Sequence, residues 1–266
     1  MVNIVKLPEW LDEYIFKTLQ ASFCPECKTL VALDYDETRL LKYLGTYFPR
    51  SYAEAYHIFN LFFQSNNRIY DGRNELSVFD FGCGTGGEAI GLLQAVIDNF
   101  PSVNKIKILA LDGNANALRI LEKIIIKFRS IHSLKIELKP FPFKIDDFYD
   151  MDVLKSETND FFDIVLAFKS LNEFVTNKQF DKDNPYSLFV KYFSSKISIN
   201  GIICVEDITS HNTISDKWIY AMMDDINDPV SLELIGRNSD RRKTICVSHS
   251  QKEKDCSKVA WRIFKR

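Results

Sequence analysis

A glycine-rich segment carries the clearest chemical signal in this 266-residue sequence. It reads Val-Phe-Asp-Phe-Gly-Cys-Gly-Thr-Gly-Gly over residues 78–87, between an apolar run and a stretch with helical periodicity. Glycines in such a turn let the backbone bend sharply and approach a ligand that side chains would keep away. Because α/β sheets bind cofactors at the carboxyl ends of their strands, this loop predicts a cofactor site.

Two acidic residues indicate what the loop binds. Asp80 precedes the loop, and Asp112 ends the next apolar run. Gly82, Gly84 and Gly87 also fit the G-x-G-x-x-G fingerprint of dinucleotide-binding proteins. A carboxylate at Asp80, however, suits a cationic ligand better than a pyrophosphate. Asp112 also lies roughly 30 residues after the first glycine, where the dinucleotide motif expects its acid about 20 residues on. An acid there can accept both ribose hydroxyls of S-adenosylmethionine (SAM), so the pattern favours SAM over NAD.

The segment Asp80–Gly86 resembles motif I of class I SAM-dependent methyltransferases, and Leu109–Leu118 looks like their second motif. The resemblance covers residues 75–265 and implies a methyltransferase with SAM as its cofactor. It implies that the loop holds the methionine part and Asp112 the ribose, that Asn114 lies near the adenosine, and that Asp146 or Asp147 faces the adenine. The expected cofactor-binding residues are Asp80, Gly82, Cys83, Gly84, Thr85, Gly86, Asp112, Gly113, Asn114, Asp146 and Lys169.

The methyl acceptor is expected beside the segment that follows the apolar run Phe162–Phe168. Methyl transfer from a sulfonium is driven by the cofactor, and a general base is needed only when the acceptor must lose a proton. Asn172 and Glu173 are the predicted catalytic residues, which orient the acceptor or take its proton; a solvated helix start is the alternative. The Asn/Asp-Pro-Pro-aromatic tetrapeptide of enzymes that methylate nucleic-acid amines is absent. Asn184-Pro-Tyr186 is interpreted as a helix N-terminus.

Several residue pairs could bind a metal, although we predict no metal. Glu206 and Asp207 follow an apolar run and could hold a cation, and the nearby His211 could act as a base. Cys24 and Cys27 supply half of a zinc site, for which two unligated cysteines are the favoured alternative. Cys246 and Cys256 could complete that site only if the tail folds back onto the N-terminal region, and their spacing is unlike that of metal ligands.

The elements that position these residues follow two patterns. Residues 1–70 are expected to be helical, with one helix ending at Pro49 and another opened by Ser51 over Tyr52–Phe63. From residue 76 onward, apolar runs alternate with helical stretches, among them Glu88–Ile97, Ala115–Phe128, Tyr186–Lys196 and Ser215–Met223. The last runs follow one another without room for a helix.

This pattern predicts an α/β fold with a Rossmann-like, doubly wound, seven-stranded sheet. The sheet should be mostly parallel and end in a C-terminal antiparallel hairpin. Residues 1–70 should form a helical extension or cap, and residues 71–266 the SAM-binding domain. Arg50 and Tyr52, expected at a helix start, are predicted to line the acceptor pocket.

Composition limits the partners and the compartment. The net charge of −2 gives no general attraction to nucleic acid, so DNA is not predicted. The first residues lack the features of a signal peptide, no apolar run approaches the roughly 20 residues of a membrane-spanning helix, and six cysteines fit a reducing compartment. A cytoplasmic protein is therefore expected.

The C-terminal stretch is basic and provides the alternative function. A non-catalytic SAM-binding or scaffold protein could hold RNA or a partner protein there. A weaker resemblance, carried by Phe48–Tyr56 and Leu166–Glu173, is to the mitochondrial small-ribosomal-subunit methyltransferase-like family, which is tied to ribosomal RNA. The basic residues are Arg237, Arg241, Arg242, Lys243, Lys252, Lys254, Lys258, Arg262, Lys265 and Arg266.

Overall fold

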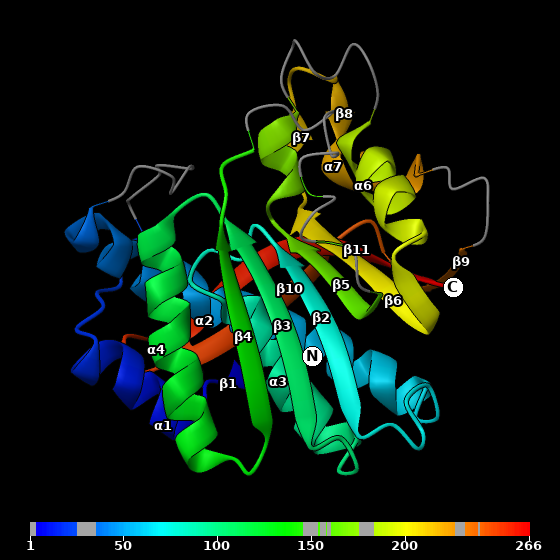
Figure 1. Ribbon diagram of the computed structural model, residues 1–266. Helices are drawn as coiled ribbons and strands as arrows, with labels where there is room; N and C mark the ends of the chain where they lie inside the picture. The colour runs from blue at the N-terminus through cyan, green and yellow to red at the C-terminus, as the bar shows by residue number, and fades with distance from the viewer. Residues whose placement is uncertain are drawn as a thin grey trace. The chain divides into compact units, whose positions relative to one another are not determined.

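The computed structural model of the chain (Figure 1) describes residues 4–25, 36–145, 154, 158, 161–175, 184–226, 232–238 and 240–266. Two compact units make up the chain, and each is discontinuous in sequence. Unit 1 comprises Met1–Glu75, Cys83–Lys144 and Thr244–Ser257, and unit 2 comprises Leu76–Gly82, Ile145–Lys243 and Lys258–Arg266.

The N-terminal part of unit 1 is not entirely helical. It contains β1 (Ile4–Lys6), α1 (Glu9–Glu13), a π-helical turn (Tyr14–Thr18) and α2 (Glu37–Ser65). β1 pairs in parallel with β10 (Lys243–His249), with Ile4 opposite Cys246. The prediction that residues 1–70 contain no strand is therefore wrong. Three residues are too few to show an alternating pattern, and the pairing depends on a partner distant in sequence.

Helix α2 runs without interruption through Pro49, so the predicted break there and the predicted helix start at Ser51 are both wrong. A proline inside a helix removes one hydrogen bond and crowds the carbonyl group four residues earlier, here that of Gly45. Phe48 and Tyr52, on either side of the proline, are both buried, and tertiary packing of this kind decides helix stability more than propensity does. In the described part of the chain no helix, α2 included, is long and apolar enough to cross a membrane.

The second part of unit 1 alternates helices and parallel strands as predicted. Its elements are α3 (Gly87–Asn99), β3 (Lys105–Asp112), α4 (Ala115–Ile131) and β4 (Lys135–Pro142). β3 and β4 are parallel, with Asp112 opposite Pro142, and α4 packs against both strands (Figure 1). This arrangement places Asp112 at the carboxyl end of β3.

Two glycines allow α2 and α3 to pack closely. A Cβ atom on Gly91 would lie 2.4 Å from the carbonyl oxygen of Tyr52, and one on Gly87 would lie 2.7 Å from that of Phe48. Both distances are shorter than real Cβ contacts. The last glycine of the G-x-G-x-x-G pattern is thus required by helix packing.

Unit 2 contains the parallel strands β2 (Glu75–Phe81), β5 (Phe162–Phe168) and β6 (Ile197–Ile208). Asp80 pairs with Leu166, and Leu166 pairs with Cys204, so the three strands end close together. β11 (Lys252–Lys265) runs antiparallel to β6, and β9 (Glu233–Arg237) runs antiparallel to β11. The predicted α/β fold with a mostly parallel sheet and antiparallel C-terminal strands is confirmed, although the main sheet has nine strands among the described residues instead of seven.

Aromatic side chains fill the core of unit 2. Phe79 on β2 contacts Phe162 and Phe193 with ring centroids 5.4 and 4.8 Å apart, and Phe81 contacts Phe189 at 5.2 Å. Phe189 and Phe193 belong to α6 (Pro185–Ser194), which begins as predicted. The side chain of Asn184 caps this helix by accepting a hydrogen bond from the backbone N–H of residue 186.

The segment after β6 differs from its prediction. A helix was expected over Ser215–Met223, but β7 (His211–Asn212) and β8 (Lys217–Trp218) form a short antiparallel hairpin. Helix α7 begins only at Ile219 and ends at Asp224. The backbone N–H of Ile219 donates to the carbonyl group of Ser210, which closes the base of the hairpin.

Candidate functional site

The glycine loop of unit 1 is folded by its own hydrogen bonds. Gly84 and Gly86 adopt left-handed conformations, with φ of +50° and +81°. The N–H of Gly86 donates to the carbonyl oxygen of Cys83 at 2.7 Å, and the N–H of Cys83 donates to that of Leu111 at 3.0 Å. Glycine is needed at both left-handed positions because other residues are strained there.

Asp112 ties this loop to the end of β3. One carboxylate oxygen accepts the N–H of Gly84 at 2.8 Å, and the other accepts the N–H of Asn114 at 2.7 Å. Burial raises the pKa of Asp112, and the two backbone hydrogen bonds act against that rise. An ionised carboxylate has about four acceptor positions, so the partly exposed Asp112 can still accept two further hydrogen bonds.

Asn114 has a structural role as well as its predicted one. Its side-chain oxygen caps α4 by accepting the N–H of Asn116 at 2.9 Å and of Ala117 at 3.3 Å. Gly113 connects Asp112 to this cap, and Thr85 in the loop is buried. Asp146 and Asp147, the residues predicted to face the adenine, lie outside the described residues.

Tyr43 on α2 is a neighbour of the loop that sequence reasoning missed. A Cβ atom on Gly84 would lie 3.3 Å from the hydroxyl oxygen of Tyr43. The Tyr43 ring also packs on Tyr47, one turn later, at 4.9 Å. Nothing in the local sequence pattern distinguishes Tyr43 from the other aromatic residues of α2.

In unit 2, Asp80 and Gly82 lie at the carboxyl end of β2. Asp80 is fully buried. Gly82 has φ of +67°, and a Cβ atom there would lie 2.5 Å from the Cβ atom of Ser170. The Ser170 hydroxyl donates to the carbonyl oxygen of Phe81 at 3.1 Å, so the turn after β5 is fixed against β2. Lys169, the first residue of that turn, has a left-handed φ of 53°, a strain that proteins often keep at functional positions.

Asp207 organises the predicted acceptor side of unit 2. Its carboxylate accepts four hydrogen bonds: from the backbone and side chain of Asn172, from the Tyr186 hydroxyl and from the N–H of Ile208. Burial raises the pKa of Asp207 to about 6 against the opposing effects of these hydrogen bonds and of the Lys169 charge. These four donors fill the acceptor positions of a carboxylate. Asp207 therefore positions Asn172 through its own hydrogen bonds.

The other polar candidates of unit 2 lie in different environments. Glu173 is exposed, in the 3-10 turn Leu171–Phe174 that also carries Asn172, whereas Glu206 is buried. His211 is exposed, with its Nε2 atom 3.5 Å from a carboxylate oxygen of Asp216. Among the described residues, no group of three or more histidine, cysteine or acidic side chains could hold a metal ion.

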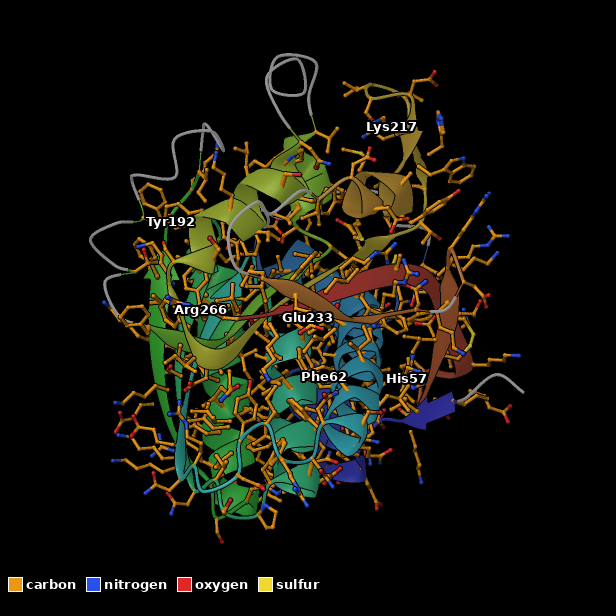
Figure 2. All side chains as sticks on the ribbon, turned by 90° about the vertical axis from the view of Figure 1, so that its right-hand side faces the viewer. His57, Phe62, Tyr192, Lys217, Glu233 and Arg266 are labelled. Atoms are coloured by element: carbon orange, nitrogen blue, oxygen red, sulfur yellow. A yellow bond between two sulfur atoms is a disulfide. The ribbon has the colours of Figure 1, made fainter. Side chains whose placement is uncertain are left out.

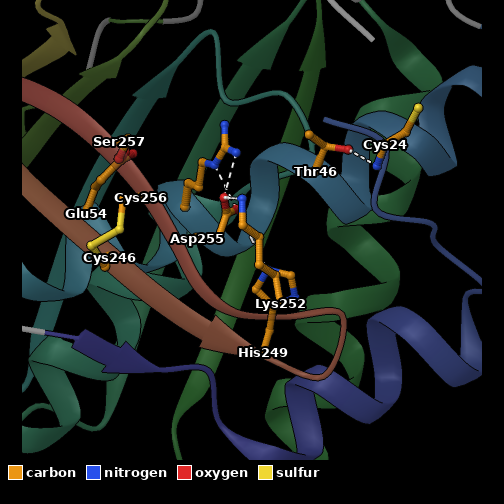
Figure 3. A network of polar contacts seen from close by, with 10 residues as sticks. Cys24, Thr46, Glu54, Cys246, His249, Lys252, Asp255, Cys256 and Ser257 are labelled. Carbon is orange, nitrogen blue, oxygen red and sulfur yellow. Dashed lines mark hydrogen bonds and ion pairs between the residues drawn. A yellow bond between two sulfur atoms is a disulfide. The ribbon is translucent and has the colours of Figure 1, made fainter. Parts of the chain in front are cut away.

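Arg50 and Tyr52 do not lie at a helix start, which was the reason for assigning them to a pocket wall. Both lie within α2, and Tyr52 is buried against Tyr56. The Arg50 guanidinium donates to both carboxylate oxygens of Asp255 at 2.8 and 2.6 Å, in the network shown in Figure 3. Although burial acts in the opposite direction, His249 and Arg50 lower the pKa of Asp255. This network connects α2 with β11 inside unit 1.

Cys246 and Cys256 do not complete a zinc site with the N-terminal cysteines. Cys246 and Cys256 form a disulfide between β10 and β11 (Figure 3), so neither sulfur is available to a metal. Cys24 donates its backbone N–H to the Thr46 hydroxyl at 2.9 Å. Cys27 lies outside the described residues. A disulfide at this spacing was not foreseen.

One member of the basic C-terminal stretch is not on the surface. Arg262 is only 3% exposed, and its guanidinium bonds to Asp224 and Asn238. Arg266 also donates to a backbone carbonyl group, that of Ile197. The predicted basic surface is therefore smaller than the sequence implied.

Comparison with known proteins gives structural matches only. No family model matches the chain, and no curated protein matches its sequence. Precorrin-6y C5,15-methyltransferase from Geobacter metallireducens matches with 13% identity and a TM-score of 0.42, over 76% of this chain and 86% of that chain. A candidate RNA methyltransferase from Pyrococcus horikoshii matches with 14% identity and a TM-score of 0.43, over 80% and 84%.

A third solved structure contains a bound product. Coclaurine N-methyltransferase, bound to N-methylheliamine and S-adenosylhomocysteine (SAH), matches with 12% identity and a TM-score of 0.44, over 99% of this chain and 83% of that chain. The three structures named here are described as methyltransferases that act on different substrates.

Proposed function

We propose that this chain is a SAM-dependent methyltransferase and that Asp112 and the loop Gly82–Gly86 hold the cofactor. The main support is the hydrogen bonding of the loop in unit 1. The N–H groups of Cys83, Gly84 and Gly86 all donate to acceptors of the protein itself. A pyrophosphate binds through backbone N–H groups of such a loop, so three of these donors are not available to a dinucleotide.

The hydrogen-bond acceptor positions of Asp112, by contrast, suit a nucleoside. Asp112 uses one acceptor position on each carboxylate oxygen for the loop and can offer the other to a hydroxyl group. Two such positions match the vicinal ribose hydroxyls of SAM. The sulfonium of SAM, once bound, supplies the activated methyl group.

The buried carboxylate of Asp80 is suited to the ammonium group of the methionine part, because burial strengthens the attraction between opposite charges. For the acceptor, we propose Asn172 as the orienting residue. Its Nδ2 atom donates to Asp207 at 2.6 Å, which fixes the amide plane and leaves Oδ1 to accept a hydrogen bond from an incoming amine or hydroxyl group. An amide cannot take a proton, so Glu173 is the residue proposed as base if the acceptor must lose one.

Equilibrium dialysis with tritiated SAM tests the cofactor site. Asp112→Asn keeps the size of the side chain but removes its charge and one set of acceptor positions. Because a hydrogen bond to a charged group contributes about 1.5–3 kcal/mol, we expect SAM affinity to fall at least about tenfold. Asp98→Asn, the same change at an exposed carboxylate on α3, is the matched control and should leave the affinity unchanged. Equal affinities for the two variants would contradict the role of Asp112.

Formation of SAH from SAM tests the transfer step. With an acceptor in place, Asn172→Ala should lower turnover while leaving SAM binding unchanged, because the side chain is proposed to touch only the acceptor. A loss of SAM binding in this variant would instead assign Asn172 to the cofactor. If small molecules, proteins and RNA all fail as acceptors of a chain that binds SAM, the non-catalytic alternative would replace the enzymatic one.

A further inference from the structure

The β7–β8 hairpin of unit 2 exposes a group of aromatic rings that the proposed function does not use. The His211 and Trp218 rings meet nearly at right angles, with centroids 5.4 Å apart. Trp218 also stacks with Tyr220 at 6.0 Å and an angle of 20°. The Trp218 side chain is 43% exposed. Aromatic rings of this size are usually buried, so an exposed and mutually ordered group indicates a binding surface.

A guanidinium group lies beside these aromatic rings. Arg241 lies over the Tyr220 ring, 6.0 Å from its centroid. We refer to His211, Trp218, Tyr220 and Arg241 as the Trp218 platform. A planar cation and several rings held side by side are the groups on which nucleic-acid bases stack.

Exposed cations are frequent in the two segments that carry the Trp218 platform. Lys217 at the hairpin (Figure 2) pairs with Asp225 at 2.7 Å, but both side chains are about half exposed and such a pair contributes little. The ammonium group of Lys217 can therefore leave Asp225 and pair with a phosphate group. The segments 211–225 and 237–243 contain three exposed acidic residues that do not bond to the buried Arg262. They are Asp216, Asp225 and Asp240. The exposed basic residues of the same segments are more numerous: Lys217, Arg237, Arg241, Arg242 and Lys243.

The Trp218 platform lies close to the residues proposed for the acceptor. His211 follows Asp207 by four residues, so their Cα atoms are at most about 14 Å apart. Asp207 in turn holds Asn172. A strand bound at the Trp218 platform can therefore reach Asn172 within a few nucleotides.

We propose that the Trp218 platform binds a single-stranded nucleic acid and presents it as the methyl acceptor. A base stacks on the exposed Trp218 ring, and phosphates pair with Arg241 and the neighbouring basic side chains. A duplex does not fit this role, because its bases are already stacked and paired. The acceptor part of this inference depends on the proposed SAM-dependent function, whereas strand binding does not.

Fluorescence anisotropy with a labelled 20-nucleotide single-stranded RNA tests the platform, with single-stranded DNA of the same sequence and the RNA duplex as further probes. Because stacking on one aromatic side chain contributes a factor of about 5 to 150, Trp218→Ala should raise the Kd for the single strand by that factor. Arg241→Ala should weaken binding and reduce the slope of log affinity against log salt by about 0.7. Phe161→Ala and Arg129→Ala are matched controls, because both side chains are exposed and lie outside the platform.

The outcomes separate the two proposals when SAM binding is measured on the same samples. A chain that binds SAM but no single strand, or binds it equally well after Trp218→Ala, overturns the platform and leaves the cofactor proposal intact. A chain that binds the single strand through Trp218 but not SAM overturns the cofactor proposal alone. Tighter binding of the duplex, or binding through Trp218 to phosphatidylserine vesicles without nucleic-acid binding, overturns the assignment. A lower Kd for single-stranded RNA than for DNA, or the reverse, shows which of the two nucleic acids the platform binds.

Discussion

Replacing Gly86 by alanine should destabilise unit 1 more than the same change at another left-handed glycine. Gly86 has φ of +81°, and an added Cβ atom would lie 2.3 Å from a methyl group of Leu121, which is fully buried on α4. The left-handed conformation costs a residue with a Cβ atom about 1–2 kcal/mol. Displacing a well-packed core side chain adds about 1–3 kcal/mol. We therefore expect Gly86→Ala to lower the free energy of unfolding by about 2–5 kcal/mol.

Gly72 provides a matched control for the backbone part of this cost. Its φ is +75°, but an added Cβ atom would meet nothing within 4 Å. Alanine there should cost only the conformational strain, and the restriction of the unfolded chain by alanine, about 0.4–1 kcal/mol, is the same at both positions. The two variants should thus differ by about 1–3 kcal/mol, which reports the contact with Leu121 alone.

Urea unfolding of the wild type and both variants, followed by circular dichroism and tryptophan fluorescence, measures these differences. Dialysis with tritiated SAM on the folded proteins adds a functional readout, because movement at Gly86 disturbs the loop whereas Gly72 lies outside it. Equal losses of stability for Gly86→Ala and Gly72→Ala would refute the reasoning from the Leu121 contact.

Three further predictions follow from the packing and the charges. Gly91→Ala places a Cβ atom 2.4 Å from the Tyr52 carbonyl oxygen, a crowding that costs about 1–3 kcal/mol, whereas alanine gains roughly 1 kcal/mol in helix propensity. The free energy of unfolding in urea titrations should therefore fall by up to about 2 kcal/mol; a stabilised variant would contradict this. Burial raises the pKa of Asp207 from 3.8 to about 6, so its contribution to stability is fully present below the unfolded pKa of 3.8 and is lost as the pH rises through 6. The stability of the wild type relative to Asp207→Asn should therefore fall by about 2 kcal/mol between pH 4 and pH 7, and a constant difference would be evidence against it. Cys256→Ser should lower the free energy of unfolding by about 2–3 kcal/mol under oxidising conditions and by nothing under reducing ones, because the disulfide with Cys246 closes a loop with a separation of 10 residues; equal losses in both conditions would show that the bond does not form.

The sequence predicts the elements whose pattern is local. The apolar run that became β5, Phe162–Phe168, is recovered with its bounds because a strand buried on both faces consists of continuous apolar residues. The helix start at Asn184 is recovered because a capping side chain followed by proline is a local signal.

Features that depend on distant partners could not be predicted in this way. Strand β1 exists because Ile4 pairs with Cys246, and α2 continues through Pro49 because its flanking residues are buried. Arg50 was assigned to a pocket by its apparent place at a helix start, but its partner, Asp255, is 205 residues away in the sequence.

The residues of the candidate site differ in the same way, because some have a local sequence signal and others depend on distant partners. Gly84 and Asp112 were identified from residue type and position, and the hydrogen bond between them joins the loop to the strand end. The donors around Asp207 could not be predicted, because residue type indicates a carboxylate but not what bonds to it. Its contacts with Asn172 and Tyr186 require the folded arrangement of three separate segments.

Calorimetric titration of the wild-type chain with SAH, beside NAD, tests the central claim most directly. A SAM-dependent methyltransferase should bind SAH at one site per chain and show no heat of binding with NAD. Binding of NAD without SAH would contradict the assignment of Asp112 and the glycine loop to SAM and would identify the site as a dinucleotide site.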